Sequence, residues 1–362
     1  MMDNDRIDQE ELNKIAQAAD TAEKMLSGYE KAPLKQRVKN AVYPLIGRTP
    51  LRHDMVFWPA GLLLLGLIEC KRTQAAADYI LKWKEKGAKL SKVDDALTGY
   101  AILRLIETGH ADLMPYAERI AEFIMHAPED EAGSIIYGSG GRNKWIYADG
   151  VGQTSLFLIE YGSMTRNDSC IKKGMLQIRN FVEYGMDDAS GLPYHGYDKE
   201  SGISMGIIGW GRAVGWLLLG MQAAVKYAAG NDAYSSLISE ITGFLCTVLS
   251  FQREDGLFSW QLQAMKGHAD SSGSAMIIWA AKKITDIIKT AAVSVPDGEV
   301  LSAVENAVRK ADPALLGMIS NGYVLGALAE CIDFAQYRQA YGCYPWGQGS
   351  VLMALGGRYT GE

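Results

Sequence analysis

Six strongly apolar segments, each with a glycine close to its start, constrain the fold of this chain more than any other feature. Segments with the alternation typical of strands are few, so these segments are predicted to be helices. Because they are apolar nearly all round, they are expected to be buried. The glycines and the residues after them are Gly61 (GLLLLGLIEC), Gly99 (GYAILRLIETG), Gly152 (GQTSLFLIEYG), Gly215 (GWLLLGMQAA), Gly273 (GSAMIIWAAKK) and Gly349 (GSVLMALGG).

More polar, one-sided helical segments lie between them, such as AADYILKWKEKG, PYAERIAEFIMHA, IKKGMLQIRNFVEYG and PDGEVLSAVENAVRKAD. Alternation of buried and half-exposed helices predicts an all-α fold, an (α/α)6 barrel of six inner and six outer helices. Each inner helix is expected to open at its glycine, which lets neighbouring helices approach closely. An open helical solenoid is the alternative. The intervals between successive glycines, 38 to 76 residues, are too irregular for a uniform array and favour the closed ring. One catalytic domain over residues 1–362 is expected.

The composition of the 362 residues narrows the function classes. The net charge is -6, which disfavours nucleic acid, since binding it requires a basic surface. No apolar run is long enough to span a bilayer, and the acidic N-terminus (MMDNDRIDQEEL) shows no secretory signal. Five scattered cysteines without a CxxC pair indicate reduced thiols, so a cytoplasmic location is expected. The oligomeric state is left open.

Three loop segments indicate where chemistry should occur. AGSIIYGSGG (from Ala132), SGLPYHGYD (from Ser190) and DGLFSW (from Asp255) each combine a turn glycine with a short alternating run, as hairpins do. All three lead into inner helices, so they should gather at one end of the barrel. The glycine-rich GSGGR from Gly138 to Arg142 lacks the lysine and hydroxyl of a phosphate-binding loop. It is interpreted as a loop over the site.

Aromatic residues are concentrated near the predicted starts of the inner helices. A ring of indole faces around a pit suits sugar rings, whose C–H faces are apolar and whose edges are polar. The alternative is that these residues only plug the end of the barrel. Six of the eight tryptophans lie there: Trp58, Trp145, Trp210, Trp216, Trp260 and Trp346.

Polar side chains are interleaved with these tryptophans. An aspartate in such a place is often a helix cap, which is the commoner role for Asp270 and also fits Asp149. No metal-ligand spacing and no GxSxG elbow occur, so neither a metal nor another cofactor is expected. Carboxylates with an arginine and no metal point to acid–base work on a carbohydrate. The candidates are Asp94, Asp95, Asp149, His195, Arg212 and Asp270.

Several motifs together resemble a known group of enzymes. They are FWPAGLLLLGL, VDDALTG, WIYADGVGQTSLFL, DDASGLPYHGYD, WGRAVGW, DGLFSW with DSSGSAM, and PWGQGSVLMAL. The chain resembles the unsaturated uronyl hydrolases of glycoside hydrolase families 105 and 88, most of all the unsaturated rhamnogalacturonyl hydrolases of family 105. The resemblance covers most of the chain, and it implies an (α/α)6 barrel.

The resemblance also implies a reaction. The substrate is an oligosaccharide whose non-reducing uronate carries a C4=C5 double bond left by a lyase, most readily unsaturated galacturonyl-rhamnose. An acid protonates C4, water adds at C5, and the resulting hemiketal opens and releases the neighbouring sugar. Asp149 corresponds to the catalytic acid and Asp94 to the second catalytic aspartate. Like-charge repulsion from Asp94 is expected to favour the protonated form of Asp149.

The same resemblance implies the substrate-binding residues. Arg212 would pair with the uronate carboxylate, and Trp216, four residues further on, would share its helix face. His195 would hydrogen-bond sugar or water. The substrate-binding set is His195, Trp210, Arg212 and Trp216 from these motifs, with Trp58 and Trp346 from the ring of tryptophans.

Two other functions fit the same fold. A sugar 2-epimerase would use a pair of histidines as bases, and only His195 and His268 lie near the predicted helix starts. A non-catalytic carbohydrate-binding protein would leave Asp149 dispensable. The leaving sugar and the length of the substrate are not fixed by the sequence.

Overall fold

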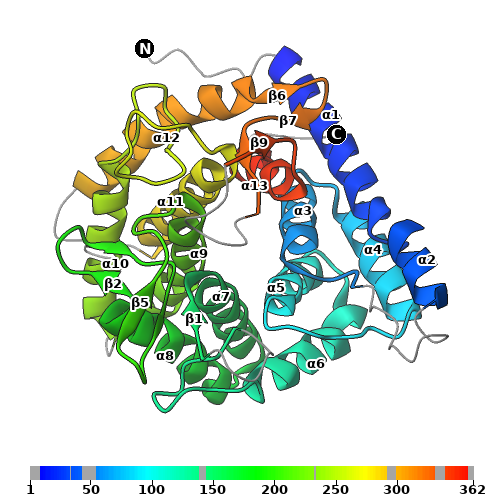
Figure 1. Ribbon diagram of the computed structural model, residues 1–362, viewed down its shortest axis with the longest axis horizontal. Helices are drawn as coiled ribbons and strands as arrows, with labels where there is room; N and C mark the ends of the chain where they lie inside the picture. The colour runs from blue at the N-terminus through cyan, green and yellow to red at the C-terminus, as the bar shows by residue number, and fades with distance from the viewer. Residues whose placement is uncertain are drawn as a thin grey trace.

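The computed structural model describes residues 9–32, 34–42, 54–137, 144–231, 234–291, 299–330 and 339–357. Within them six buried helices form an inner ring (Figure 1). The inner helices are α3 (Trp58–Glu69), α5 (Asp95–Glu107), α7 (Ala148–Thr165), α9 (Gly211–Ala228), α11 (Ser271–Thr290) and α13 (Pro345–Gly356). Each packs against the next in this order, and α13 packs against α3, which closes the ring.

Six amphipathic helices surround the inner ring (Figure 1). They are α1 (Gln9–Gly28), α4 (Thr73–Glu85), α6 (Met114–Met125), α8 (Asp168–Tyr184), α10 (Ser235–Leu249) and α12 (Glu299–Gly317). The chain enters with α1, which packs on both α3 and α13 and so covers the seam between the first and last inner helices. Two further elements are α2 (Leu34–Val42) and the short helix η2 (Ala111–Leu113). The predicted all-α (α/α)6 barrel is confirmed.

The glycines of the inner helices allow close backbone contact. A Cβ atom at Gly152 would lie 2.0 Å from the carbonyl oxygen of Trp216 on α9, and one at Gly349 would lie 2.4 Å from the carbonyl carbon of Leu62 on α3. The expectation that each glycine opens its helix is wrong, since every inner helix begins two to four residues earlier. The glycines lie in the first turns because helix packing, not helix initiation, requires them.

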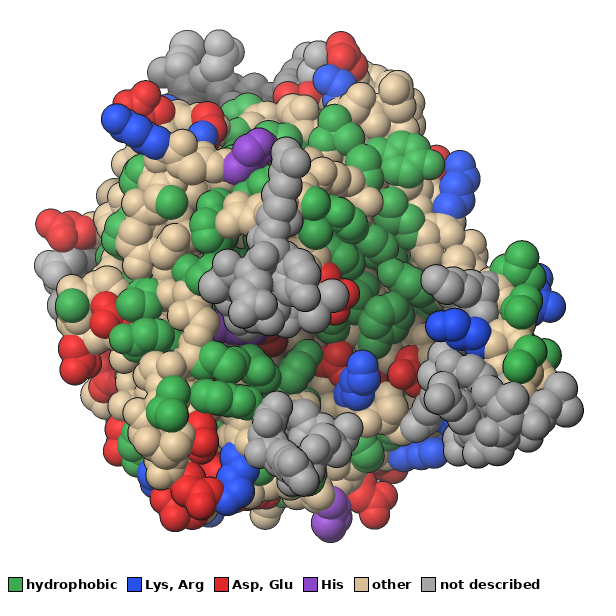
Figure 2. Space-filling model, viewed as in Figure 1, with side chains coloured by type: hydrophobic (Ala, Val, Ile, Leu, Met, Phe, Trp, Pro, Cys, Tyr) green, Lys and Arg blue, Asp and Glu red, His purple; other side chains and the backbone are tan. Residues whose placement is uncertain are grey.

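Short antiparallel strands occupy the segments that lead into three inner helices. β1 (Ile146–Tyr147), β4 (Gly196–Asp198) and β5 (Ile203–Met205) form one sheet in the order β1-β4-β5. The pairs β2 (Met186–Asp187) with β3 (Leu192–Pro193), β6 (Ile319–Ser320) with β7 (Tyr323–Val324), and β8 (Ala327–Leu328) with β9 (Tyr341–Gly342) form three hairpin-like ladders. All therefore belong to the end of the barrel where inner helices begin. Figure 2 shows hydrophobic side chains gathered around the middle of the viewed face and most charged ones toward its rim.

The predicted hairpin loops are only partly regular. The segment from Ser190 contains β3 and β4, whereas the segment from Asp255 has only the isolated bridge Ser259–Ala269. The strands β6–β9 were not predicted, because two-residue strands leave no alternation to detect. The GSGGR segment lies outside the described residues. None of the described helices has the length and apolar composition needed to cross a membrane.

Candidate active site

Asp149 lies in the first turn of α7, and a small sheet holds His195 beside it. Tyr147 of β1 pairs with Gly196 of β4, and the backbone N–H of Ala148 donates to the carbonyl of His195 at 2.9 Å. The imidazole Nε2 of His195 then lies 2.8 Å from Oδ2 of Asp149. The carboxylate is 18% exposed and the imidazole is largely buried. The structure therefore brings these two predicted residues into direct contact, a pairing that sequence analysis did not anticipate.

Aromatic rings fix the orientation of the imidazole. The ring of Trp210 meets it edge to face with centroids 4.7 Å apart, and the ring of Tyr147 lies 4.8 Å away. Gly206 passes over His195 with a φ of +82°, and a Cβ there would lie 2.7 Å from the Cβ of His195. This loop therefore requires glycine, and the imidazole has little freedom to turn away from Asp149.

The adjacent residues Asp94 and Asp95 have different environments. Asp95 is wholly buried and its Oδ2 accepts from the backbone N–H groups of Ser91 (2.7 Å) and Lys92 (3.3 Å), so it stabilises the turn before α5. Asp94, 3% exposed, makes no capping hydrogen bond at its N-cap position. Its Oδ1 has no hydrogen-bond partner among the described residues. Oδ1 of Asp95 likewise has no partner there, so the two residues differ in that only Asp95 is tied to the backbone of the preceding turn.

Burial dominates the electrostatics of this pair. It raises the pKa of Asp94 to about 6, an effect that the ammonium of Lys92 opposes and the charge of Asp54 reinforces. Burial likewise raises the pKa of Asp95 to about 7, although the N–H groups of Ser91 and Lys92 oppose it. Near neutral pH each of the two carboxyl groups is therefore close to its own pKa.

The phenol of Tyr137 is affected by the charges of both Asp94 and Asp149. Burial raises the pKa of its phenol well above the ordinary value, and the charges of Asp94 and Asp149 raise it further. Both carboxylates therefore lie within electrostatic reach of one hydroxyl group, which stays protonated and can donate. The ring rests on α7, since a Cβ at Gly150 would lie 2.6 Å from its Cδ2. Sequence analysis missed this residue, because an isolated tyrosine in a loop (SIIYG) carries no motif.

Asp270 is a helix cap, as its position suggested. Its Oδ1 accepts from the backbone N–H of Ser272 (3.0 Å), the hydroxyl of Ser272 (2.6 Å) and the N–H of Leu328 (2.9 Å). Asp149 and Asp94 make no such cap. Capping thus accounts for Asp270 and leaves the other two aspartates available for chemistry.

Arg212 has different partners from those expected. Its side chain is 2% exposed, and its guanidinium donates to the carbonyls of Leu328 (2.8 Å) and Ala329 (2.9 Å) and lies 3.6 Å from Oδ2 of Asp270. It also lies 4.7 Å from the ring centroid of Trp210. A buried arginine needs such partners. They tie α9 to α11 and β8, and a contact with substrate stays a prediction.

The tryptophans of the predicted binding set differ in exposure and in the groups they contact. Trp58 and Trp346 pack with centroids 5.0 Å apart, and Trp346 donates its Nε1–H to the carbonyl of Leu328 at 2.8 Å. Trp216 is only 1% exposed and meets Trp58 edge-on at 6.3 Å. Trp216 therefore supports Trp58 from below and offers no free face, which differs from the expected stacking role. Trp210 supports His195 and Arg212.

The site is therefore an acid–base arrangement of side chains. Among the described residues, no group of three or more His, Cys, Asp and Glu side chains is placed to hold a metal ion. The described cysteines Cys70, Cys170, Cys246 and Cys343 are free thiols. A carboxyl with an oriented imidazole, a second buried carboxylate and a phenol can transfer protons to and from a bound sugar.

Comparisons with known proteins give a family match and a curated relative over most of the chain. The family model described as Glycosyl Hydrolase Family 88 matches residues 36–360. A curated relative, the unsaturated rhamnogalacturonyl hydrolase YesR of Bacillus subtilis (strain 168), is 23% identical over 336 residues, which cover 89% of this chain and 94% of that protein.

Solved structures show the same fold. The crystal structure of a possible member of the GH105 family from Salmonella enterica serovar Paratyphi A has a TM-score of 0.76 at 17% identity, covering 99% of this chain and 96% of that one. The unsaturated glucuronyl hydrolase of Bacillus sp. GL1, described as responsible for the degradation of glycosaminoglycan, has a TM-score of 0.65 at 16% identity, covering 85% and 88%.

Proposed function

This chain belongs to Glycosyl Hydrolase Family 88, and on that premise we propose that it releases a 4,5-unsaturated uronate from the non-reducing end of lyase-generated oligosaccharides. The proposed substrate is unsaturated galacturonyl-rhamnose, in line with the relative from Bacillus subtilis. The observation that carries the proposal is the 2.8 Å contact between Asp149 and His195 at the start of an inner helix. This contact supplies an oriented acid. The proposed reaction does not require a second carboxyl close enough to act as a nucleophile.

Asp149 is the proposed general acid. His195 donates its Nε2–H to Oδ2, so the transferable proton sits on Oδ1 and is delivered to C4 of the substrate. Protonation breaks the C4=C5 π bond and leaves positive charge on C5 and the ring oxygen. As the proton leaves, Asp149 becomes an anion, and the hydrogen bond from His195 becomes charge-assisted. This interaction is stronger in the transition state than in the ground state, which is the requirement for catalysis.

Water then completes the reaction at C5. It adds its oxygen to C5 and returns a proton to the Asp149 carboxylate, which restores the acid. The hemiketal formed at C5 opens to a keto group as the bond between C5 and the ring oxygen breaks, which leaves a hemiacetal at C1. That hemiacetal collapses to an aldehyde, and the glycosidic oxygen takes up the hydroxyl proton and leaves with the neighbouring sugar. Asp94, with an unoccupied Oδ1, would accept a hydrogen bond from this water or from a sugar hydroxyl. Tyr137 would donate one.

The substrate grip would come from both aromatic and charged groups. Trp58 is partly exposed at the start of α3, so its ring can present an apolar face to a sugar. Trp346 packs against Trp58, is itself buried and has Tyr344 stacked on its ring, so it supports Trp58. A direct pairing of Arg212 with the uronate carboxylate would require its guanidinium to share or exchange the carbonyls of Leu328 and Ala329. With or without that direct pairing, the buried positive charge of Arg212 would favour binding of the uronate.

The test is loss of the ultraviolet absorbance of the conjugated enoate. Unsaturated disaccharides from rhamnogalacturonan and from glycosaminoglycans are incubated in parallel with the protein, with Asp149→Asn and with Asp168→Asn. Asp168 is a matched control, since it also lies in the first turn of a helix but is exposed on the outer helix α8. Absorbance should fall with wild type and Asp168→Asn, fastest on the rhamnogalacturonan product, and stay constant with Asp149→Asn. No decay on either substrate would refute the proposal.

A further inference from the structure

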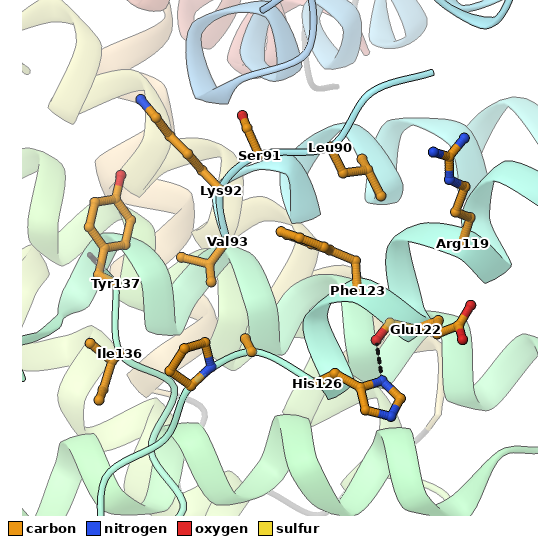
Figure 3. A pocket seen from close by; sticks show the side chains of 12 residues that line it. Leu90, Ser91, Lys92, Val93, Arg119, Glu122, Phe123, His126, Ile136 and Tyr137 are labelled. Atoms are coloured by element: carbon orange, nitrogen blue, oxygen red, sulfur yellow. Dashed lines mark hydrogen bonds between the residues drawn. The ribbon is translucent and has the colours of Figure 1, made fainter. Parts of the chain in front are cut away.

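A pocket of about 550 Å³ opens between the loop before α5, the helix α6 and the segment 127–137 (Figure 3). This volume is within the range of ligand-binding pockets. In Figure 3 the ring of Phe123 projects from α6 toward Val93, with Lys92 and Tyr137 at one side of the view and Arg119 at the other. The apolar part of the lining is Leu90, Val93, Phe123, Ala127, Pro128 and Ile136.

The charged lining of this pocket is predominantly positive. Lys92 and Arg119 are cations, and Glu122 is the one carboxylate among the lining residues. Arg119 is exposed and has no ion-pair partner among the described residues, even though Glu122 lies one turn further along α6. His126 has its Nδ1 2.8 Å from the backbone carbonyl of Glu122, so its ring is held along the pocket edge. An apolar lining with a guanidinium at one edge suits a ligand that has an apolar face and an anionic group.

The pocket borders the candidate active site at Tyr137, whose ring packs against Gly150, the residue after Asp149. Tyr137 lines it, and the hydroxyl of the same residue is within reach of the charges of Asp94 and Asp149. Lys92 also lines it, and its ammonium lowers the pKa of Asp94. A chain of sugars whose first ring lies at Asp149 can therefore extend past Tyr137 and Lys92 toward Arg119.

We propose that this pocket is a subsite for an acidic sugar beyond the leaving sugar, with the carboxylate of that sugar on Arg119 and its apolar face on Phe123. The proposal rests on the function proposed above. Its consequence is a preference for unsaturated oligosaccharides that carry a further uronate over unsaturated disaccharides. Arginine offers two parallel N–H donors to a carboxylate, a geometry that lysine lacks.

The test compares kcat/KM for an unsaturated disaccharide and an unsaturated tetrasaccharide of alternating uronate and neutral sugars. Wild type should prefer the tetrasaccharide. Arg119→Gln should lower kcat/KM for the tetrasaccharide about 3- to 10-fold through KM, as expected for a partly exposed ion pair, and leave the disaccharide unchanged. Arg119→Lys should have a kcat/KM for the tetrasaccharide between those of wild type and Arg119→Gln. Added salt should reduce the preference of wild type for the tetrasaccharide. Arg179→Gln, a change at an exposed arginine of α8, is the matched control and should change neither.

A binding measurement separates this subsite from the reaction. Calorimetric titration of the tetrasaccharide into Asp149→Asn should give a Kd that Arg119→Gln weakens by the same factor. An equal tetrasaccharide-to-disaccharide ratio for wild type and Arg119→Gln would overturn the subsite while leaving the proposed function intact. If wild type turns over neither substrate, the proposed function fails. A Kd for the tetrasaccharide that does not depend on Arg119 would then overturn the subsite as well.

Discussion

The substitution Asp95→Asn separates a structural carboxylate from a catalytic one. Asp95 is wholly buried, and its pKa is raised from 3.8 to about 7 by burial. Because the folded pKa lies above the unfolded one, the protonated form stabilises the fold. This contribution is fully present below the unfolded pKa and is lost as the pH rises through about 7. The difference between the two pKa values corresponds to about 4 kcal/mol at pH 8.

An asparagine at this position matches the shape of the protonated acid and keeps an oxygen for the N–H groups of Ser91 and Lys92. Asp95→Asn should therefore unfold like wild type near pH 4, and should be more stable by up to about 4 kcal/mol at pH 8. Urea unfolding of both proteins at the two pH values measures this difference. Asp95→Asn should retain turnover of the unsaturated substrate, whereas Asp94→Asn should lose it. A variant that is less stable than wild type at pH 8 would refute the burial argument, and loss of turnover would reverse the assignment of the pair.

Three further substitutions test other parts of the site. His195→Gln should lower kcat about 10- to 100-fold, the worth of one charge-assisted hydrogen bond, with little change in KM; an unchanged kcat would remove His195 from the mechanism of Asp149. Lys92→Met should raise the pKa of Asp94, since the ammonium now lowers it, so the acid limb of the kcat/KM profile should move to higher pH; a shift to lower pH would contradict this sign. Arg212→Lys should weaken substrate binding, because lysine cannot replace the planar fork; wild-type kinetics with a normal melting temperature would show that Arg212 is dispensable for binding.

The architecture could be predicted because it depends on repeated, local features. Six apolar helices with glycines in their first turns leave few folds other than a closed double ring. The predicted starts of these helices were wrong, because a glycine such as Gly152 marks a backbone contact with another helix and not the end of a loop. The strands β6 to β9 were missed because two residues give no periodic signal.

The sequence identifies individual candidate residues of the site but not the contacts between them. The motif WIYADG marks Asp149 and the motif GLPYHG marks His195, yet their 2.8 Å contact depends on the pairing of β1 with β4, which are 50 residues apart along the chain. The burial of Arg212 depends on carbonyl groups that follow it by more than a hundred residues. Such long-range partners leave no trace in local spacing.

The central claim, hydration of a double bond with Asp149 as the acid, is tested most directly by isotopic labelling. The protein is incubated with unsaturated galacturonyl-rhamnose, once in heavy water and once in water labelled with oxygen-18, and the released sugars are analysed by NMR and mass spectrometry. Hydration predicts deuterium at C4 of the uronate product and the oxygen label at C5. Oxygen label at the anomeric carbon of the uronate, with no deuterium at C4, would show ordinary glycosidic cleavage and contradict the account.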